Sequence, residues 1–298
     1  MGNLTKWSNE DYKAWRAKHA IKRSYESEVV SKIESLKSEF NISKYGELNY
    51  PEGNYPLYNL KSKIFSKEKP NILITGGVHG YETSGVQGAL LFMKKYAAKW
   101  EDQFNFICFP CISPWGYETI NRWNPDALDP NRNFTKNSPA QECQNIYNEL
   151  ERMDLSFLAH FDLHETTDTD NTVFRPDLEK RDGVPQEVWD IPDGFYIVGD
   201  TSRREDDFQK AMIESVRSVT HIAPSDAHNK LIGEDTIAEG IINYDVKKLF
   251  LCAGLTNAPY VTTTEVYPDS PKVTDDECNK AQVMSVVGGL EYLAKTSL

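Results

Sequence analysis

The sequence lacks any hydrophobic run near the roughly 18 apolar residues that a membrane span needs, and its first residues lack the apolar core of a signal peptide. Positive charge is also in short supply, with 33 Lys and Arg against 45 Asp and Glu and a net charge of −12. A chain with this negative net charge is repelled by nucleic acid and by anionic membranes, and is therefore poorly suited to bind either of them. We therefore expect neither as a partner.

Cysteine is scarce, and its five positions are scattered along the chain rather than paired at regular spacing. An odd, scattered set does not form a disulfide framework, which predicts reduced thiols and a cytoplasmic location. Cys108 and Cys111 have the spacing of a redox pair, but they lie in an apolar, strand-like run. Packing in the core is the better interpretation, since a redox thiol needs a helix N-terminus to lower its pKa.

No repeat, low-complexity tract or domain linker interrupts the 298 residues, and 39% of them are hydrophobic, enough for one full core. We expect a single domain over residues 1–298. Tyr25, Val29 and Ile33 recur at helical spacing and predict an N-terminal helical extension over about 1–44. Residues 168–238 are polar and turn-rich, and we expect this insertion to form one wall of a substrate pocket.

Two metal-ligand side chains, His79 and Glu82, stand three positions apart just after an apolar run at residues 71–75 and a glycine pair. Imidazole and carboxylate both suit Zn²⁺, and a catalytic zinc site uses three protein ligands with one position left open. The pattern therefore predicts a zinc half-site at the carboxyl end of a buried strand. A third ligand must come from elsewhere in the chain.

His164 is the best candidate for the third ligand because it ends another apolar, strand-like run. The period-2 alternation of this run predicts that His160, Asp162 and His164 share one face of a strand. In open α/β sheets, ligands bind at the carboxyl ends of the strands. The two strand ends can therefore converge on one ion.

Five segments, in this order, resemble the zinc carboxypeptidase superfamily, which has the aspartoacylase and succinylglutamate desuccinylase group as close relatives. The second departs from the family pattern at Ser113 and Trp115. The segments are residues 77–82 (Gly-Val-His-Gly-Tyr-Glu), 113–118 (Ser-Pro-Trp-Gly-Tyr-Glu), 129–134 (Asp-Pro-Asn-Arg-Asn-Phe), 162–164 (Asp-Leu-His) and 263–267 (Thr-Thr-Glu-Val-Tyr).

The resemblance implies a three-layer α/β/α fold with a mixed, mostly parallel central sheet. It also implies that one Zn²⁺ is held by His79, Glu82 and His164, with Asp129 as a carboxylate that fixes the first histidine through its other ring nitrogen. Glu265 would be the general base and later the proton donor. From the β-rich run alone, Glu265 could equally be an edge-strand glutamate in solvent.

Arg132 is the expected anchor for a substrate carboxylate, because a guanidinium fork matches a carboxylate and Asn131 can add an amide donor. The alternative is an arginine that stabilises a Pro-Asn turn. Arg122 resembles the family's oxyanion-stabilising arginine, and Tyr244 resembles its substrate-capping tyrosine. The apolar residues 249–253 favour an uncharged pocket for the substrate side chain.

These assignments predict a zinc metallocarboxypeptidase that hydrolyses the last peptide bond of small peptides. The first alternative is an N-acyl amino acid amidohydrolase. It is favoured by residues 162–167 (Asp-Leu-His-Glu-Thr-Thr), which are similar to the Asp-Leu-His-Asn-Thr-Thr of aspartoacylases. A non-catalytic binding module that kept the fold is the second alternative. The complete set of ligands together with Glu265 argues against it.

Overall fold

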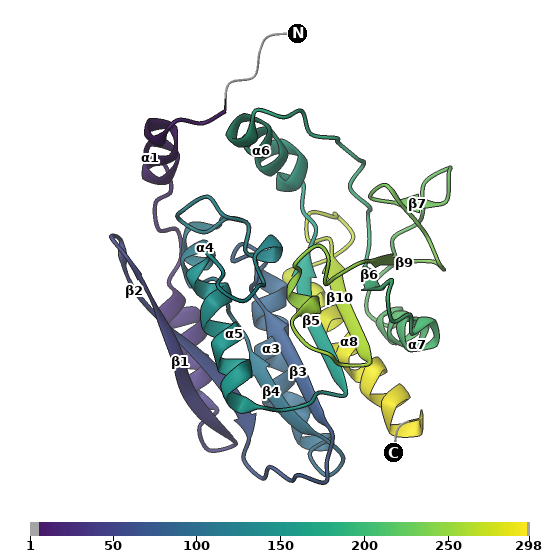
Figure 1. Cartoon of the computed structure of the whole chain (residues 1–298). Helices are drawn as coiled ribbons and strands as arrows, with labels where there is room; N and C mark the ends of the chain where they lie inside the picture. Colours follow the sequence, from purple (N-terminus) through teal and green to yellow (C-terminus); the bar gives the residue numbers. More distant parts are fainter. Residues whose placement is uncertain (1–5, 297–298) are drawn as a thin grey trace.

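The computed structural model describes residues 6–296, in which a mixed eight-stranded sheet lies between layers of helices (Figure 1). The strands follow the order β1-β2-β4-β3-β5-β10-β6-β9 across the sheet. Their bounds are β1 Phe40–Tyr50, β2 Gly53–Ser62, β3 Asn71–Gly76, β4 Asn105–Phe109, β5 Ala159–Glu165, β6 Tyr196–Asp200, β9 Ile241–Tyr244 and β10 Tyr260–Val266, with a separate pair β7 Lys230–Leu231 and β8 Glu234–Asp235.

Helices cover both faces of the sheet, with α5 in front and α3 and α8 behind in Figure 1. The α-helices are α1 Asn9–Ala17, α2 Ser31–Ser35, α3 Thr83–Lys95, α4 Pro114–Thr119, α5 Gln141–Met153, α6 Arg175–Asp182, α7 Asp206–Val216 and α8 Asp275–Thr296. Short 3-10 or π segments are η1 Glu26–Val30, η2 Ala97–Lys99, η3 Pro130–Arg132, η4 Asp170–Phe174 and η5 Cys252–Gly254.

The directions of the strands confirm the expected α/β fold with a mixed central sheet. The pairs β3–β4, β3–β5, β5–β10 and β6–β9 are parallel, whereas β1–β2, β2–β4 and β6–β10 are antiparallel. Parallel strands are covered on both faces and therefore carry continuous apolar runs. Ile72, Leu73 and Ile74 of β3 are fully buried, as are all seven residues of β5. The parallel strands thus form the centre of the core.

The N-terminal segment differs from the sequence prediction at its end. Residues 1–5 of the predicted extension lie outside the described part of the chain. Helices α1, η1 and α2 occupy much of residues 9–35, but the chain turns after Leu36, and Phe40 begins β1 rather than a further helical turn. Helical spacing did not mark this boundary because Phe40 is buried as a strand residue, paired with Ser62 of β2.

Helix α8 begins with a capping box. Thr274 caps α8, since its hydroxyl accepts from the backbone N–H of Glu277 at 3.4 Å and the Glu277 carboxylate accepts from the N–H of Thr274 at 2.8 Å. All five cysteines are free and buried. Within residues 6–296, the helices are too short or too polar to traverse a bilayer.

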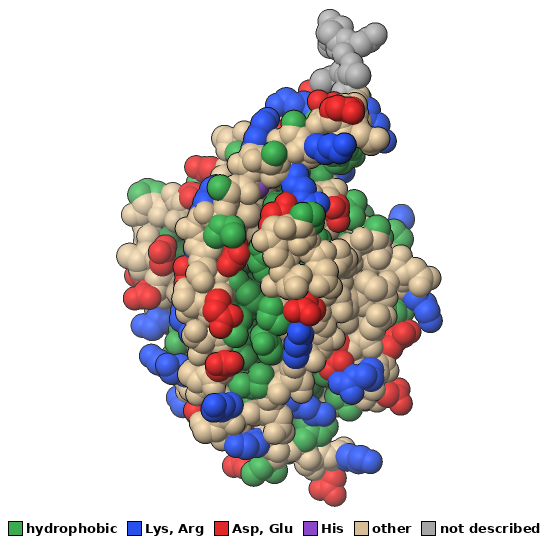
Figure 2. All heavy atoms as spheres, turned by 90° about the vertical axis from the view of Figure 1, so that its left-hand side faces the viewer, with side chains coloured by type: hydrophobic (Ala, Val, Ile, Leu, Met, Phe, Trp, Pro, Cys, Tyr) green, Lys and Arg blue, Asp and Glu red, His purple; other side chains and the backbone are tan. Residues whose placement is uncertain are grey.

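The face that carries the β1–β2 edge shows Lys and Arg side chains interspersed with Asp and Glu (Figure 2). Arg16 of α1, which is partly exposed, pairs with Glu52 in the turn between β1 and β2 at 2.7 Å and with Asp126 at 3.3 Å. These pairs join the N-terminal helix to the body of the domain. Each is partly exposed, so each contributes at most about 1 kcal/mol.

Glu142, in the first turn of α5, is a fully buried carboxyl group that is poorly solvated. Its Oε2 accepts weak hydrogen bonds from Tyr50 at 3.3 Å and Asn124 at 3.4 Å, while its Oε1 has no hydrogen-bond partner. Burial raises the pKa of Glu142 from 4.5 to about 7, although these hydrogen bonds oppose the shift. The folded chain therefore holds this proton more tightly than the unfolded chain does.

The stabilising effect of that proton is complete below pH 4.5 and is lost as the pH rises through about 7. We expect the Glu142→Gln variant to be more stable than the parent chain at pH 8, by about 1 to 3 kcal/mol. The difference should shrink toward zero at pH 5. Urea unfolding of both proteins at the two pH values measures it, and an equal difference at pH 5 and pH 8 would contradict the argument.

Candidate metal centre and active site

The candidate site lies where three neighbouring parallel strands end. β3, β5 and β10 are adjacent in the sheet, with Thr75 opposite Asp162 and His164 opposite Glu265. Opposite residues on neighbouring strands lie about 5 Å apart and point to the same face. The strand register therefore brings His164 and Glu265 side by side, just beyond the end of β3 where His79 and Glu82 follow.

The three predicted metal ligands come together in the folded chain. His79, Glu82 and His164 are all buried, and one potential ligand atom of each lies within 4.8 Å of the others. Nδ1 of His79 lies 2.6 Å from Oε1 of Glu82, and Nδ1 of His164 lies 2.8 Å from Oε2 of the same carboxylate. Both imidazoles thus present the same ring nitrogen to one point.

The other nitrogen of each imidazole is held by an aspartate. Nε2 of His79 lies 2.9 Å from Oδ1 of Asp129, and Nε2 of His164 lies 2.9 Å from Oδ2 of Asp162. A carboxylate can only accept, so each Nε2 donates its proton to its aspartate. With a cation bound among these groups, each Nδ1 would then offer its lone pair to the ion. Such carboxylate partners fix the tautomer and orientation of histidines that bind metals.

A divalent cation fits this set of donor atoms for two reasons, the negative charge around it and a carboxylate oxygen that lacks a hydrogen-bond partner. Oε2 of Glu82 is buried and has no hydrogen-bond partner, since its approach to His164 lacks hydrogen-bond geometry. Three buried carboxylates, Glu82, Asp129 and Asp162, surround two imidazoles. Burial works against ionisation, yet the two imidazoles lower the pKa of Glu82 to about 2. Two histidines and one glutamate are also a ligand set that zinc uses in catalytic sites.

We expect an Asp162→Asn variant to bind zinc about 10- to 100-fold more weakly. The neutral amide of asparagine fixes the charge and the tautomer of His164 less well than the carboxylate of Asp162 does. Competition with a chromogenic chelator measures the affinity. Asp207→Asn is the matched control, since Asp207 is 78% exposed and, among the residues that the structure describes, forms an ion pair only with Lys210 of its own helix. Unchanged zinc affinity in the Asp162 variant would show that this carboxylate does not support a ligand.

The loop between the first two ligands is held by a residue that the sequence analysis missed. Arg23 of the N-terminal segment donates to the carbonyl of Gly80 at 3.0 Å, to the hydroxyl of Thr83 at 2.7 Å and to the carbonyl of Tyr117 at 2.6 Å. Its guanidinium group also stacks 3.5 Å from the centre of the Tyr117 ring. Arg23 lies in a bend between α1 and η1, in a stretch without a recognisable motif, so no local signal pointed to this contact.

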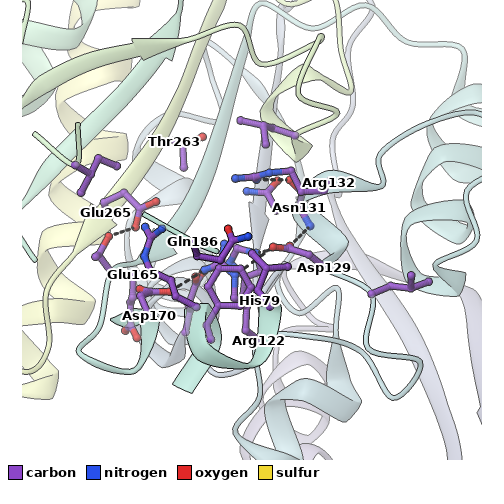
Figure 3. A pocket seen from close by; sticks show the side chains of 18 of the residues that line it. His79, Arg122, Asp129, Asn131, Arg132, Glu165, Asp170, Gln186, Thr263 and Glu265 are labelled. Atoms are coloured by element: carbon purple, nitrogen blue, oxygen red, sulfur yellow. Dashed lines mark hydrogen bonds and ion pairs between the residues drawn. The ribbon is translucent and has the colours of Figure 1, made fainter. Parts of the chain in front are cut away.

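Glu265 points into a cavity of about 590 Å³ that two of the candidate ligands, His79 and Glu82, also line (Figure 3). Its Oε2 accepts a hydrogen bond from the hydroxyl of Thr166 at 2.9 Å. Burial raises the pKa of Glu265 to about 8, Glu82 adds to the rise, and His164 opposes it. The edge-strand alternative is wrong, because β10 is an interior strand and this carboxyl group faces the cavity.

Three predicted substrate-binding residues line the same cavity: Asn131, Arg132 and Tyr244. The side-chain oxygen of Asn131 accepts from the backbone N–H of Cys252 at 2.8 Å, which orients the amide. Arg132 donates to the carbonyl of Asn131 at 2.7 Å and, within residues 6–296, forms no ion pair. Figure 3 shows Arg132 and Asn131 across the cavity from Glu265. Their substrate-binding role stays a prediction.

Arg122 also lines the cavity, but it is held by two carboxylates. Its Nε donates to Asp129 at 3.2 Å, and its Nη1 donates to Asp170 at 3.0 Å and to the hydroxyl of Tyr81 at 3.4 Å. Burial favours the neutral form of Arg122 and lowers its pKa. The carboxylates of Asp129 and Asp170 outweigh this effect, so that the pKa of Arg122 is raised. The guanidinium group is therefore a fixed positive charge beside His79.

Glu165, the residue that favoured the deacylase alternative, contacts the start of α3. Its carboxylate accepts from the backbone N–H of Ser84 at 2.6 Å and of Thr83 at 3.2 Å. Burial raises the pKa of Glu165 to about 7, and these donors oppose the rise. A carboxylate at the N-terminus of a helix stabilises the helix dipole. This structural role accounts for Glu165 without assigning a substrate contact to it.

Solved structures with the same architecture are metallopeptidase-like. A candidate metallopeptidase from Shewanella amazonensis is 18% identical, with a TM-score of 0.66 over 89% of this chain and 90% of its own. A metallo-carboxypeptidase from Burkholderia cenocepacia is 14% identical, with a TM-score of 0.62 over 97% of this chain and 70% of its own. A metallo-carboxypeptidase from Pseudomonas aeruginosa, in complex with (2-guanidinoethylmercapto)succinic acid, is 12% identical, with a TM-score of 0.57 over 97% of this chain and 70% of its own.

The chain therefore has the fold of the metallo-carboxypeptidases, as the resemblance of its motifs implied. A family model described as a protein of unknown function, DUF2817, matches residues 66–186. These residues include all three candidate metal ligands. A comparison with curated proteins finds no match.

Proposed function

We propose that this protein is a zinc-dependent carboxypeptidase that removes the last residue of short peptides. The observation that carries the proposal is the convergence of three functions in one cavity. His79 and Glu82 line the cavity and form a cation site with the adjoining His164, and Glu265 offers a proton acceptor. Arg132, which forms no ion pair within residues 6–296, offers a guanidinium group for a terminal carboxylate. Comparable folds in metallo-carboxypeptidases support the same reaction class.

A zinc ion held by His79, Glu82 and His164 would supply Lewis acidity and lower the pKa of a water molecule to near 7. Asp129 and Asp162 keep the two imidazoles in the tautomer that this requires. The aspartates thus act on the reaction only through the histidines that they orient.

Substrate binding rests on groups that face Glu265 across the cavity. Arg132 binds the terminal carboxylate through its guanidinium fork, and the amide of Asn131 adds a donor. Tyr244, half-buried at the end of β9, covers the bound residue from the side. Tyr12 of α1 and Leu178 of α6 also line the cavity, which favours short substrates over folded proteins.

Glu265 accepts the proton of the attacking water as the new C–O bond forms at the scissile carbonyl. The negative charge that develops on the carbonyl oxygen is stabilised by Arg122, which its two carboxylate partners hold in place. Glu265 then delivers the proton to the nitrogen as the C–N bond breaks. The products are a shortened peptide and a free amino acid.

The proposal is tested by mass spectrometry of a mixed peptide library incubated with zinc-loaded protein. We expect single residues to be lost from the C-terminus, and we expect no loss with chelator-treated protein. N-acyl amino acids included in the same reactions test the amidohydrolase alternative, which uses the same groups on an acyl chain. Hydrolysis of the N-acyl amino acids with intact peptides would replace the carboxypeptidase proposal, and turnover of neither by zinc-loaded protein would favour a binding module.

A further inference from the structure

Four guanidinium groups line the cavity, but only two of them have carboxylate partners. Arg122 pairs with Asp129 and Asp170, and Arg181 pairs with Asp182 at 2.8 Å. Within residues 6–296, neither Arg132 nor Arg175 forms an ion pair. Arg132 already has an assignment, as the anchor for the terminal carboxylate. The positive charge of Arg175 is left without a role.

Arg175 is the first residue of α6. Within residues 6–296 it forms no ion pair, although the charge of the more distant Asp170 acts on it. Its Nη1 donates to the carbonyl of Glu187 at 2.8 Å, and its guanidinium group stacks 4.2 Å from the centre of the Trp189 ring. Its Nε is buried and has no hydrogen-bond partner. The side chain is therefore fixed by its neighbours while a donor remains unused. A charged donor in this condition fits an anionic ligand group.

Arg175 and Arg132 line the same cavity, together with Tyr244 and Trp189. Burial lowers the pKa of Arg175, the carboxylate of Asp170 opposes this shift, and the like charges of Arg122 and Arg132 add to it. Two cations in one cavity repel each other less when an anion binds between or beside them. A small ligand with two carboxylates offers one to each guanidinium group.

We propose that the residue released from the substrate has an acidic side chain, with Arg132 binding its terminal carboxylate and Arg175 binding its side-chain carboxylate. This inference rests on the proposed function, and it identifies the substrate class as peptides that end in glutamate or aspartate. A guanidinium group beside a carboxylate gives charge-assisted hydrogen bonds that an amide side chain cannot match.

The apolar residues 249–253, which favoured an uncharged pocket, lie mostly away from the cavity. Leu249 and Phe250 are 38% and 50% exposed. Of this segment, Leu251 lines the cavity. The insertion also lines the cavity, and it contributes Arg175 and Trp189.

Binding of small probes to zinc-loaded protein tests the inference without requiring turnover. N-acetyl-L-glutamate and N-acetyl-L-glutamine have nearly the same shape and differ in the side-chain charge. We expect calorimetry to give about 10- to 100-fold tighter binding of the glutamate probe. The Arg175→Gln variant should lose this preference and keep its affinity for the glutamine probe. The inference would be overturned if the Arg175→Gln variant still bound the glutamate probe more tightly than the glutamine probe. This includes the case in which the metal ion, and not Arg175, binds the side-chain carboxylate.

Lys180→Gln is the charge-matched control, because Lys180 is an exposed residue of the same helix that lies outside the cavity. It should keep the full preference. N-succinyl-L-glutamine carries the second carboxylate on the acyl group instead of the side chain. Tighter binding of this probe than of N-acetyl-L-glutamate, abolished by Arg175→Gln, would overturn the placement of the acidic group on the released residue.

The outcome is separable from the fate of the proposed function. If the peptide library is trimmed but the wild-type protein binds both probes equally, the carboxypeptidase proposal stands and the acidic specificity is wrong. If no peptide is trimmed but the glutamate preference depends on Arg175, the anion site stands and the reaction is wrong. Each result therefore decides one of the two proposals.

Discussion

Replacing Glu265 with glutamine is expected to lower the rate of peptide hydrolysis by about 10²- to 10⁴-fold, the usual contribution of a general acid–base group. Glutamine has nearly the same size and can still accept a hydrogen bond from Thr166, but it cannot take up a proton. The zinc affinity and the thermal stability should change little, because Glu265 is not one of the three converging ligand groups. Steady-state kinetics on a short peptide measures the loss.

Two controls make this result specific. Zinc content, determined on the same samples, should remain near one ion per chain in the variant. A Thr263→Val variant alters a nearby residue of β10 that lines the same cavity but carries no proton-transfer group. It should retain activity within about tenfold. Near-normal hydrolysis by the Glu265→Gln variant would remove this residue from the mechanism.

Replacing Gly80 with alanine is expected to be the most disruptive single change in the metal loop. A Cβ atom at this position would lie 2.1 Å from the backbone nitrogen of Tyr117, 2.2 Å from the carbonyl carbon of Gly116 and 2.5 Å from the carbonyl oxygen of Ser113. These are backbone atoms of α4 and its start, so a side-chain rotation cannot relieve the overlap. We expect a loss of about 3 kcal/mol or more in unfolding free energy.

The same substitution should weaken zinc binding, because Gly80 stands between His79 and Glu82 and the collision must move that loop. Unfolding in urea and zinc competition measure the two effects. Gly53→Ala is the control, since its added methyl group meets no atom within 4 Å and reports only the strain of a positive φ of 155°. Equal stability losses in the two variants would show that close packing at Gly80 is not what the loop requires.

The metal centre was predictable from the sequence because its residues carry a local signal. His79 and Glu82 follow an apolar strand and a glycine pair, and Gly77 adopts a φ of 59° that favours glycine. The alternation of β5 determined which side chains share a face. Strand ends converge in parallel sheets as a general property of the fold, so the grouping of these residues needed no further information.

The surroundings of the metal centre were less predictable because they depend on contacts between distant segments. Asp170, which fixes Arg122, lies 48 residues further along the chain in an insertion without a regular pattern. The contact of Arg23 with Gly80 spans 57 residues. Arg175 attracted no attention because an arginine at the start of a polar helix is common on protein surfaces. Only the folded chain shows that Arg122, Asp170 and Arg175 line one cavity.

Glu165 shows how the role of a residue depends on the fold. Its position beside His164, in a segment similar to that of aspartoacylases, favoured the N-acyl amino acid amidohydrolase alternative. The strand direction carries its carboxylate toward the N-terminus of α3, where it accepts two backbone N–H groups. Glu165 also lines the cavity, so this contact leaves the alternative open. The sequence motif alone could not show the contact with the start of the helix.

The most direct test of the carboxypeptidase account compares two matched peptide pools that differ only at the C-terminus, which is a free carboxylate in one and an amide in the other. Zinc-loaded protein is incubated with each pool, and mass spectrometry follows the loss of single residues. The account predicts removal of one C-terminal residue from the free-acid pool and none from the amide pool, because Arg132 and Asn131 bind the terminal carboxylate. Equal cleavage of both pools, or cleavage at internal bonds, would contradict it.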